Sequence, residues 1–292
     1  MYRVHCLLPR ADAERLSDIL TDMDPSPASA VSVEEASKVS WSLDAFCTDE
    51  DLAKQAAAVI EREIPSARAA VQKLDDKDWV AVSLAGLPAV HAGPFVVAGW
   101  HELAHLEGGK IPVWIEAGPA FGTGHHGTTK GCLEALAIEL KRKRPLRVLD
   151  VGTGSGVLAL AAVKYGAGFA LGTDMDKESI RIAKENAKNN TAGRRLKLMH
   201  ARGTGHRMIR AHAPYDLVLA NILARPLVSL APEIARMVAR GGRVILSGLL
   251  THQEPQVRAA YAGQGLTLVN RRRLNGWSTL VYARQNHSGT TL

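Results

Sequence analysis

Cysteine is scarce in this chain of 292 residues. Its three cysteines, Cys6, Cys47 and Cys132, are widely separated and odd in number, so they form neither a disulfide framework nor the paired spacing of a zinc site. No apolar run approaches the ~20 residues that a membrane-spanning helix needs, and the first residues lack the apolar stretch of a signal peptide. These absences predict a cytoplasmic protein with reduced thiols, no bound metal and no membrane contact.

Acidic residues are outnumbered by basic ones, 29 against 36, which gives a formal net charge of +7. Dense cationic runs occur only at 141–144 and 271–273, and the remaining charge is spread along the chain. A basic surface favours acidic partners, including nucleic acid. A merely solvated basic surface explains the same composition equally well.

The pattern of apolar residues and breakers divides the chain into four parts. Residues 1–75 follow the order βαββαβ, which predicts a ferredoxin-like α+β domain, and because no catalytic motif lies in it we interpret it as a substrate-recognition domain. Residues 76–117 are rich in proline and glycine and read as a linker. Residues 118–284 predict a Rossmann-like α/β domain, a seven-stranded sheet with helices on both faces, and 285–292 form a polar tail.

The chain is organised around the stretch from Arg147 to Asp174. A short apolar run ends at Asp150, a turn follows with glycine at every second position, and a helix pattern leads to a second apolar run closed by Asp174. Strand, glycine turn, helix and strand make one βαβ unit, which requires a parallel sheet. Glycine is needed in such a turn because the backbone approaches a ligand with no Cβ in the way.

The glycine spacing indicates which ligand this turn holds. A dinucleotide site has the pattern G-x-G-x-x-G, whereas Gly152 and Gly154 belong to G-x-G-x-G. Asp150 would repel a pyrophosphate but can hold an ammonium group, and Asp174 stands where an acid reads ribose hydroxyls. S-adenosylmethionine has an amino-acid end, a ribose and no phosphate, so these four residues predict its site. The alternative is a generic Rossmann turn with incidental acids.

A glycine-rich loop from Phe121 to Thr129 leads into a helix. A helix N-terminus favours an anion, so we expect the methionyl carboxylate of the cofactor there, with the Thr129 hydroxyl as an added donor. Phe121 and the glycines could close over the ligand. The alternative is an ordinary capped helix after a loop.

The run 221–224 (NILA) ends a later strand at the same sheet edge. Methyl transfer to an amine needs acceptors that orient the N–H bonds and aim the lone pair, and the Asn221 side-chain oxygen and the Ile222 carbonyl can do so by positioning alone. No aromatic ring follows Asn221, which favours an aliphatic amine over a flat acceptor. The alternative is an asparagine that merely ends a strand.

Residues 101–105 (HELAH) match the H-E-x-x-H zinc motif. That motif needs a sustained helix, and Gly99, Gly108 and Gly109 leave barely two turns here. The adjacent His125 and His126 cannot face one metal from a helix. We therefore expect no metal, and a zinc peptidase remains the remote alternative.

These motifs together resemble the PrmA-type methyltransferases that modify large-subunit ribosomal protein eleven. The resemblance is strong over residues 74–262. It departs from the family pattern GTGTHPTT at His125 and Gly127, where the family has threonine and proline. The runs that carry it are AFGTG…TT at 120–129, DVGTGSGVLALAAVKYGA at 150–167, GTDMD at 172–176, ANILARPL at 220–227 and, more weakly, LDDKDW at 74–79.

The resemblance implies an enzyme that methylates the α-amino group and lysine ε-amino groups of the ribosomal protein, up to the trimethyl state. It implies cofactor contacts at Thr129, Gly152, Asp174 and Asn221. It also implies a large-subunit ribosomal protein as partner. We expect the enzyme to act as a monomer. From the basic composition we expect ribosomal RNA nearby, and we expect no DNA. Other interpretations are a methyltransferase of RNA or of a small-molecule amine, and a cofactor-binding module without catalysis.

Overall fold

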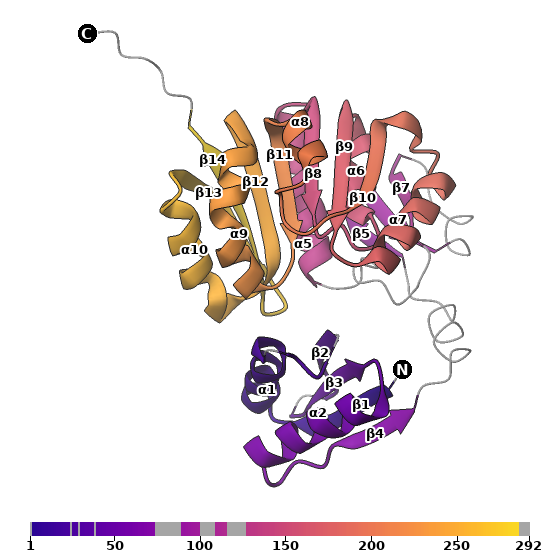
Figure 1. Cartoon of the computed structure of the whole chain (residues 1–292), viewed down its shortest axis with the longest axis vertical. Helices are drawn as coiled ribbons and strands as arrows, with labels where there is room; N and C mark the ends of the chain where they lie inside the picture. The colour runs from indigo at the N-terminus through magenta and orange to yellow at the C-terminus, as the bar shows by residue number, and fades with distance from the viewer. Residues whose placement is uncertain are drawn as a thin grey trace. The chain divides into compact units, whose positions relative to one another are not determined.

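The computed structural model describes residues 2–23, 25–28, 30–37, 39–73, 89–99, 109–115 and 127–285. The chain forms two compact units, Met1–Val82 and Ser83–Leu292 (Figure 1). Among the described residues, no helix has the length and apolar character needed to cross a membrane.

The first unit has the predicted βαββαβ order. Its strands pair antiparallel in the order β2-β3-β1-β4, which is a ferredoxin-like sheet. Alternation along β1 turns Val4, Cys6 and Leu8 toward the two helices, where they join Leu16 and Ile60 in one core. The elements are β1 (Tyr2–Leu8), α1 (Arg10–Asp22), β2 (Ala30–Glu35), β3 (Trp41–Cys47), α2 (Glu50–Glu63) and β4 (Ala70–Lys73).

The second unit contains the predicted seven-stranded sheet, in the order β10-β9-β8-β11-β12-β14-β13. The first five strands are parallel, and β14 runs antiparallel to both β12 and β13. The strands are β8 (Arg147–Val151), β9 (Phe169–Asp174), β10 (Leu196–His200), β11 (Tyr215–Asn221), β12 (Val238–Leu250), β13 (Leu266–Leu274) and β14 (Trp277–Arg284).

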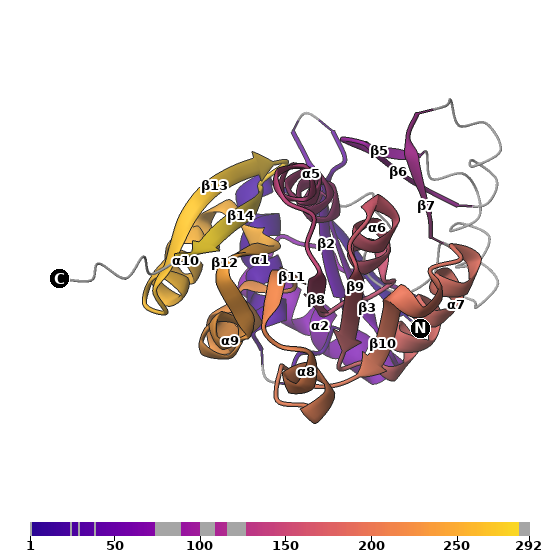
Figure 2. The same ribbon diagram turned by 90° about the horizontal axis from the view of Figure 1, so that it is seen from above.

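Helices cover both faces of this sheet, as Figure 2 shows from above. One apolar core joins α5 and α6 to the sheet, and the other joins α8, α9 and α10 to the opposite face. The Asp176 side chain caps α7 by accepting the N–H groups of Glu178 and Ser179, as the sequence predicts. The helices are α5 (Gly127–Arg142), α6 (Val157–Tyr165), α7 (Lys177–Asn189), α8 (Arg207–His212), α9 (Ala224–Met237) and α10 (Glu254–Ala262).

A third, three-stranded sheet lies within the stretch predicted as a linker. It consists of β5 (Val90–Ala92), β6 (Phe95–Ala98) and β7 (Ile111–Trp114), in the order β5-β6-β7. Phe95 and Val113 are buried in the same core as α5 and α6, and the Phe95 ring lies 5.7 Å from the Tyr165 ring. These three strands therefore belong to the second unit and not to a linker.

One expected helix end is wrong. The sequence predicts a helix over 226–238 that Gly241 and Gly242 end. In the structure α9 ends at Met237, and β12 begins at the next residue, so the two glycines lie in a strand. Tyr215 of β11 pairs with Val238 of β12, and Leu217 pairs with Arg243. Four residues of β12 therefore lie opposite one residue of β11 between these two pairs. The two glycines form this bulge, since a Cβ at Gly242 would lie 2.7 Å from the carbonyl oxygen of Ala239.

Candidate functional site

The predicted site residues meet at the carboxyl edge of the parallel strands. β8 lies between β9 and β11. After β8 the chain adds β9 and β10 on one side of it and then crosses to add β11 and β12 on the other side. This is the switch point at which open α/β sheets bind ligands. Asp174 ends β9 and Asn221 ends β11.

The glycine turn after β8 has the backbone that only glycine adopts readily. Gly152, Gly154 and Gly156 have φ angles of 71°, 53° and 85°. The N–H groups of Gly152 and Thr153 donate to the Thr173 carbonyl at 2.8 and 2.9 Å, which ties the turn to β9. A Cβ at Gly152 would lie 2.2 Å from Cγ2 of Ile222. The turn therefore has no room for a side chain at this position.

Asp174 is half-buried and holds the turn from the β9 side. Its Oδ2 accepts the Gly154 N–H at 2.9 Å, and its Oδ1 accepts the Asp176 N–H at 3.0 Å. Each carboxylate oxygen can accept a second hydrogen bond. Asp174 can therefore keep the turn in place and still receive the hydroxyls of a ribose.

Asp150 is buried, with 1% of its surface exposed. Its Oδ2 accepts the Thr153 hydroxyl at 2.6 Å, whereas its Oδ1 is buried with no hydrogen-bond partner among the described residues. Burial raises the pKa of Asp150 to about 7, an effect that the Thr153 hydroxyl partly offsets and that the charge of Asp174 increases. An open acceptor on a buried carboxyl group suits a ligand that brings an ammonium group.

Thr129 and Asn221 come together across 92 residues of sequence. Asn221 Nδ2 donates to Thr129 Oγ1 at 3.4 Å, and Thr129 is fully buried in the first turns of α5. Asn221 Oδ1 is buried and has no partner within the described structure. The edge thus offers a second open acceptor, on the strand next to Asp150.

Ile222 links the glycine turn to β12. Its N–H donates to the Ser247 carbonyl at 3.2 Å. Its own carbonyl oxygen lies against Gly248, where a Cβ would be only 2.3 Å away. The role of this carbonyl as an amine acceptor stays a prediction.

Sequence reasoning missed the residues that position α5. A Cβ at Gly131 would lie 2.4 Å from Oγ1 of Thr279, which in turn is hydrogen-bonded to Ser247 Oγ at 3.1 Å. Ser247 also donates to the Ser278 carbonyl at 2.9 Å. The signal in the sequence is an isolated glycine inside a helical pattern, which marks a close approach.

Several predicted residues fall outside the described part of the chain. These are Phe121, His125, His126 and the HELAH run at 101–105. Gly127 is described, and α5 begins there. In the described ranges no cluster of three or more His, Cys, Asp or Glu side chains could hold a metal ion. The HELAH run lies outside the described ranges, so the absence of a metal stays a prediction.

Comparisons with known proteins identify relatives of this chain. The family model for ribosomal protein L11 methyltransferase (PrmA) matches residues 3–285. A ribosomal protein L11 methyltransferase from Caulobacter sp. (strain K31) is 46% identical over 278 residues, covering 94% of this chain and 95% of the relative. A second, from Bradyrhizobium diazoefficiens, is 43% identical over 277 residues, covering 93% of each chain.

The solved structure of a ribosomal protein L11 methylase from Lactobacillus delbrueckii subsp. bulgaricus is 30% identical to this chain, with a TM-score of 0.59. The match covers 68% of this chain and 99% of the chain in that structure. These matches confirm the S-adenosylmethionine-dependent methyltransferase class that the glycine turn predicts. The chain therefore belongs to the ribosomal protein L11 methyltransferase (PrmA) family.

Proposed function

We propose that this chain transfers methyl groups from S-adenosylmethionine to the α-amino group and lysine ε-amino groups of ribosomal protein L11, up to the trimethyl state. It acts as a monomer in the cytoplasm, close to ribosomal RNA and without DNA or membrane partners. Its relatives, which are named ribosomal protein L11 methyltransferases, support the substrate. The observation that carries the chemistry is the pair of open, buried acceptors on neighbouring strands, Asp150 Oδ1 and Asn221 Oδ1.

The cofactor half of the site follows from β8 and β9. Gly152 and Gly154 let the backbone approach the ligand, and Asp174 accepts the ribose hydroxyls. Asp150 accepts the ammonium group of the methionyl end. The methionyl carboxylate of the cofactor binds at the N-terminus of α5 beside Thr129, and Phe121, outside the described residues, stays the expected cover. When bound, S-adenosylmethionine supplies a methyl group on a positively charged sulfur.

The acceptor half follows from β11. Each round begins when the ammonium group loses a proton to water. In the first transfer Asn221 Oδ1 accepts one N–H of the neutral amine and the Ile222 carbonyl the other, so the lone pair is held toward the methyl group. Every methyl group added replaces one of these N–H groups. Ile222, Leu223 and Ala224 follow Asn221 where a flat substrate would need a ring to stack upon. The pocket therefore suits an aliphatic amine, which can rotate between successive transfers.

Residues 1–75 serve as the substrate-recognition domain and 118–284 as the catalytic domain, to which the strands β5, β6 and β7 of the expected linker 76–117 are added, and 285–292 serve as the tail. Support comes from the sheet face of the first unit that turns away from its helices. There Asp44, only 7% exposed, accepts Arg3 Nε at 2.5 Å and is bonded to His5 Nδ1 at 2.8 Å. A polar cluster on a sheet face without helices suits contact with a polar protein surface.

Intact-mass spectrometry tests this function. Ribosomal proteins from cells that lack the enzyme are incubated with the purified protein and S-adenosylmethionine. We expect methyl-sized mass increments on L11, which also count the methyl groups. Increments on a different protein, or methylation found only in the RNA fraction, would overturn the substrate and leave the cofactor site standing.

A further inference from the structure

The amino edge of the seven-stranded sheet, opposite the methyl-transfer edge, gathers cations from four separate segments. Because β8, β10, β11 and β12 are parallel, the residues that precede them all lie at one edge. Residues 141–147 carry five Lys or Arg, 194–197 three, 207–210 two and 236–243 three. Short helix α8, which supplies 207–210, lies at the upper end of the sheet in Figure 1.

Acidic residues are nearly absent from these segments. Asp216 is the single one between 207 and 216, and its Oδ2 is occupied by the N–H groups of Leu146 and Arg147 at 2.9 and 3.0 Å. Lys141, Arg236 and Arg240 are exposed and have no ion-pair partner in the part of the chain that is described. Their charges are therefore available to an external anion.

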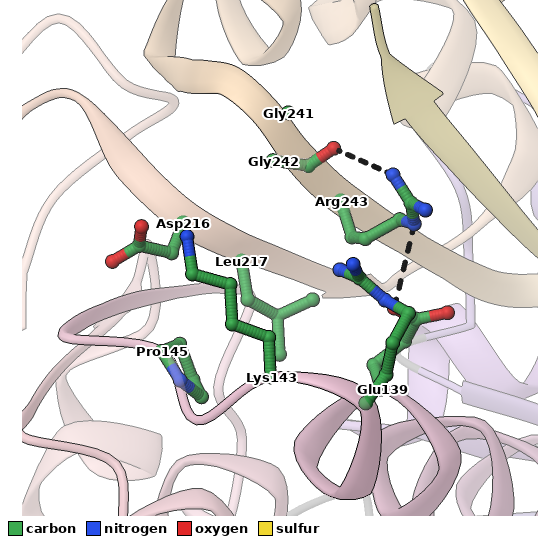
Figure 3. A pocket seen from close by; sticks show the side chains of 9 residues that line it. Glu139, Lys143, Pro145, Asp216, Leu217, Gly241, Gly242 and Arg243 are labelled. Carbon is green, nitrogen blue, oxygen red and sulfur yellow. Dashed lines mark hydrogen bonds and ion pairs between the residues drawn. The ribbon is translucent and has the colours of Figure 1, made fainter.

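A hollow opens within this edge (Figure 3). Lys143 reaches toward Asp216 on one side, and Glu139 pairs with Arg243 on the other, with Nε 3.4 Å from Glu139 Oε2. Arg243 Nε is buried and makes no hydrogen bond within the described structure. The hollow is lined by three cations, Arg142, Lys143 and Arg243, against two acids, Glu139 and Asp216, so its excess positive charge favours an anion over a cation.

We propose that this amino edge binds the phosphate backbone of RNA. From β10 to β12 the edge spans four strand spacings, roughly 19 Å at ~4.8 Å each. A nucleic-acid strand presents several phosphates over that length, and Arg is well matched to phosphate oxygens. RNA held here would leave the cofactor edge free. The inference extends the proposed function, because a ribosomal protein substrate is encountered near RNA.

The test measures RNA binding by the full-length protein without any methyl transfer. A fluorescein-labelled RNA hairpin of mixed sequence is titrated by anisotropy at several salt concentrations. The edge variant carries Lys141→Glu, Arg236→Glu and Arg240→Glu. The control carries Lys184→Glu, Arg258→Glu and Lys110→Glu, three exposed cations on α7, on α10 and just before β7. Both variants lose the same formal charge, and thermal melts check that both fold.

We expect the edge variant to bind the hairpin at least about tenfold more weakly. The slope of log affinity against log salt should fall by about 2, since each lost phosphate contact removes ~0.7 to 0.9. The control should change less than about threefold. Equal losses in both variants would overturn the proposal, because net charge alone would then explain binding. Tighter binding of polyglutamate than of the hairpin would instead assign an acidic protein.

Methyl transfer to L11 is measured in parallel on the same variants. Both should retain wild-type turnover, because none of the six residues belongs to the cofactor edge. A wild-type protein that binds the hairpin but methylates no ribosomal protein would refute the proposed function alone. A wild-type protein that methylates L11 but leaves the hairpin unbound would refute the RNA surface alone.

Discussion

Gly131 and Thr279 are in direct contact, with the position of a Cβ on Gly131 only 2.4 Å from Thr279 Oγ1. Thr279 is 4% exposed and bonded to Ser247 Oγ at 3.1 Å, so its hydroxyl cannot easily turn away. This contact seats the first turns of α5 against β14. It thereby brings Thr129, two residues earlier, to Asn221.

Gly131→Ala should displace the start of α5 and weaken S-adenosylmethionine binding about tenfold, ~1.4 kcal/mol. The second change Thr279→Ala should restore much of that affinity, because it removes Oγ1 and leaves the Thr279 Cβ at an ordinary 3.4 Å. Thr279→Ala alone should have a small effect. Calorimetry on the three variants decides this, and a double variant as weak as Gly131→Ala would contradict the contact.

Gly152→Ala should nearly abolish cofactor binding. The substitution strains a backbone at φ 71° and drives a methyl group into Ile222 Cγ2 at 2.2 Å. Ile222→Ala in the same chain should relieve only the clash, so recovery should be partial. Affinity for S-adenosylhomocysteine and the melting temperature of each variant are the measurements. Full recovery in the double variant would show that the backbone angle carries no cost.

Asp174→Ala and Asn221→Ala should separate binding from turnover. Asp174→Ala removes the expected ribose contact and the hydrogen bond to the Gly154 N–H. Cofactor affinity should therefore fall by about 100-fold, because each lost hydrogen bond to a charged group is worth ~1.5 to 3 kcal/mol.

Asn221→Ala should lower kcat more than it lowers cofactor affinity, because Oδ1 orients the amine. Steady-state kinetics with calorimetry test both, and normal kcat in Asn221→Ala would remove its orienting role.

Asp150 should make cofactor binding depend on pH. Its pKa is raised to about 7 by burial, and an ammonium group binds the ionised form. Affinity should therefore fall below pH 7, by at most about tenfold per pH unit. Asp150→Asn should bind weakly at every pH from 5.5 to 7.5 and flatten the profile. A wild-type profile that is already flat would show that the ligand does not use this carboxyl group.

The same raised pKa has a consequence for stability. In the folded chain the carboxyl group of Asp150 keeps its proton up to about pH 7. In the unfolded chain the same group is already ionised above about pH 4. The folded state thus binds more protons between these values, and the free energy of unfolding should fall as pH rises through that window. Denaturant titrations at pH 4.5 and 7.5 should show a smaller fall for Asp150→Asn. An identical fall in both proteins would rule out Asp150 as its source.

The sequence predicts most of the fold because its signals are local. The helix over 157–165 lies between Gly156 and Gly166, and the structure gives these bounds unchanged. Short patterns likewise predict the Asp176 cap and a hairpin of 266–272 with 279–283, which the structure contains as β13 and β14. Gly241 misleads because a glycine pair signals a helix end and a strand bulge equally well, and only the pairing with β11 decides between them.

The candidate site is predictable where a short motif determines the local backbone. The roles of Asp150 and Asp174 could be predicted because each stands at the end of an apolar strand pattern of the βαβ unit that contains the glycine turn. The partners of α5 could not be predicted, because Thr279 is 148 residues beyond Gly131 and only the packing of β14 brings them together. The open acceptor on Asn221 also depends on that packing.

The measurement that tests the account most directly is a crystal structure of this protein with S-adenosylhomocysteine. The ribose hydroxyls should lie on Asp174, the ammonium group on Asp150 Oδ1 and the carboxylate at the N-terminus of α5 beside Thr129. Asn221 Oδ1 should face the sulfur across an open space for the amine. Ligand density at the amino edge, or a ribose that avoids Asp174, would contradict the assignment of the carboxyl edge as the methyl-transfer site.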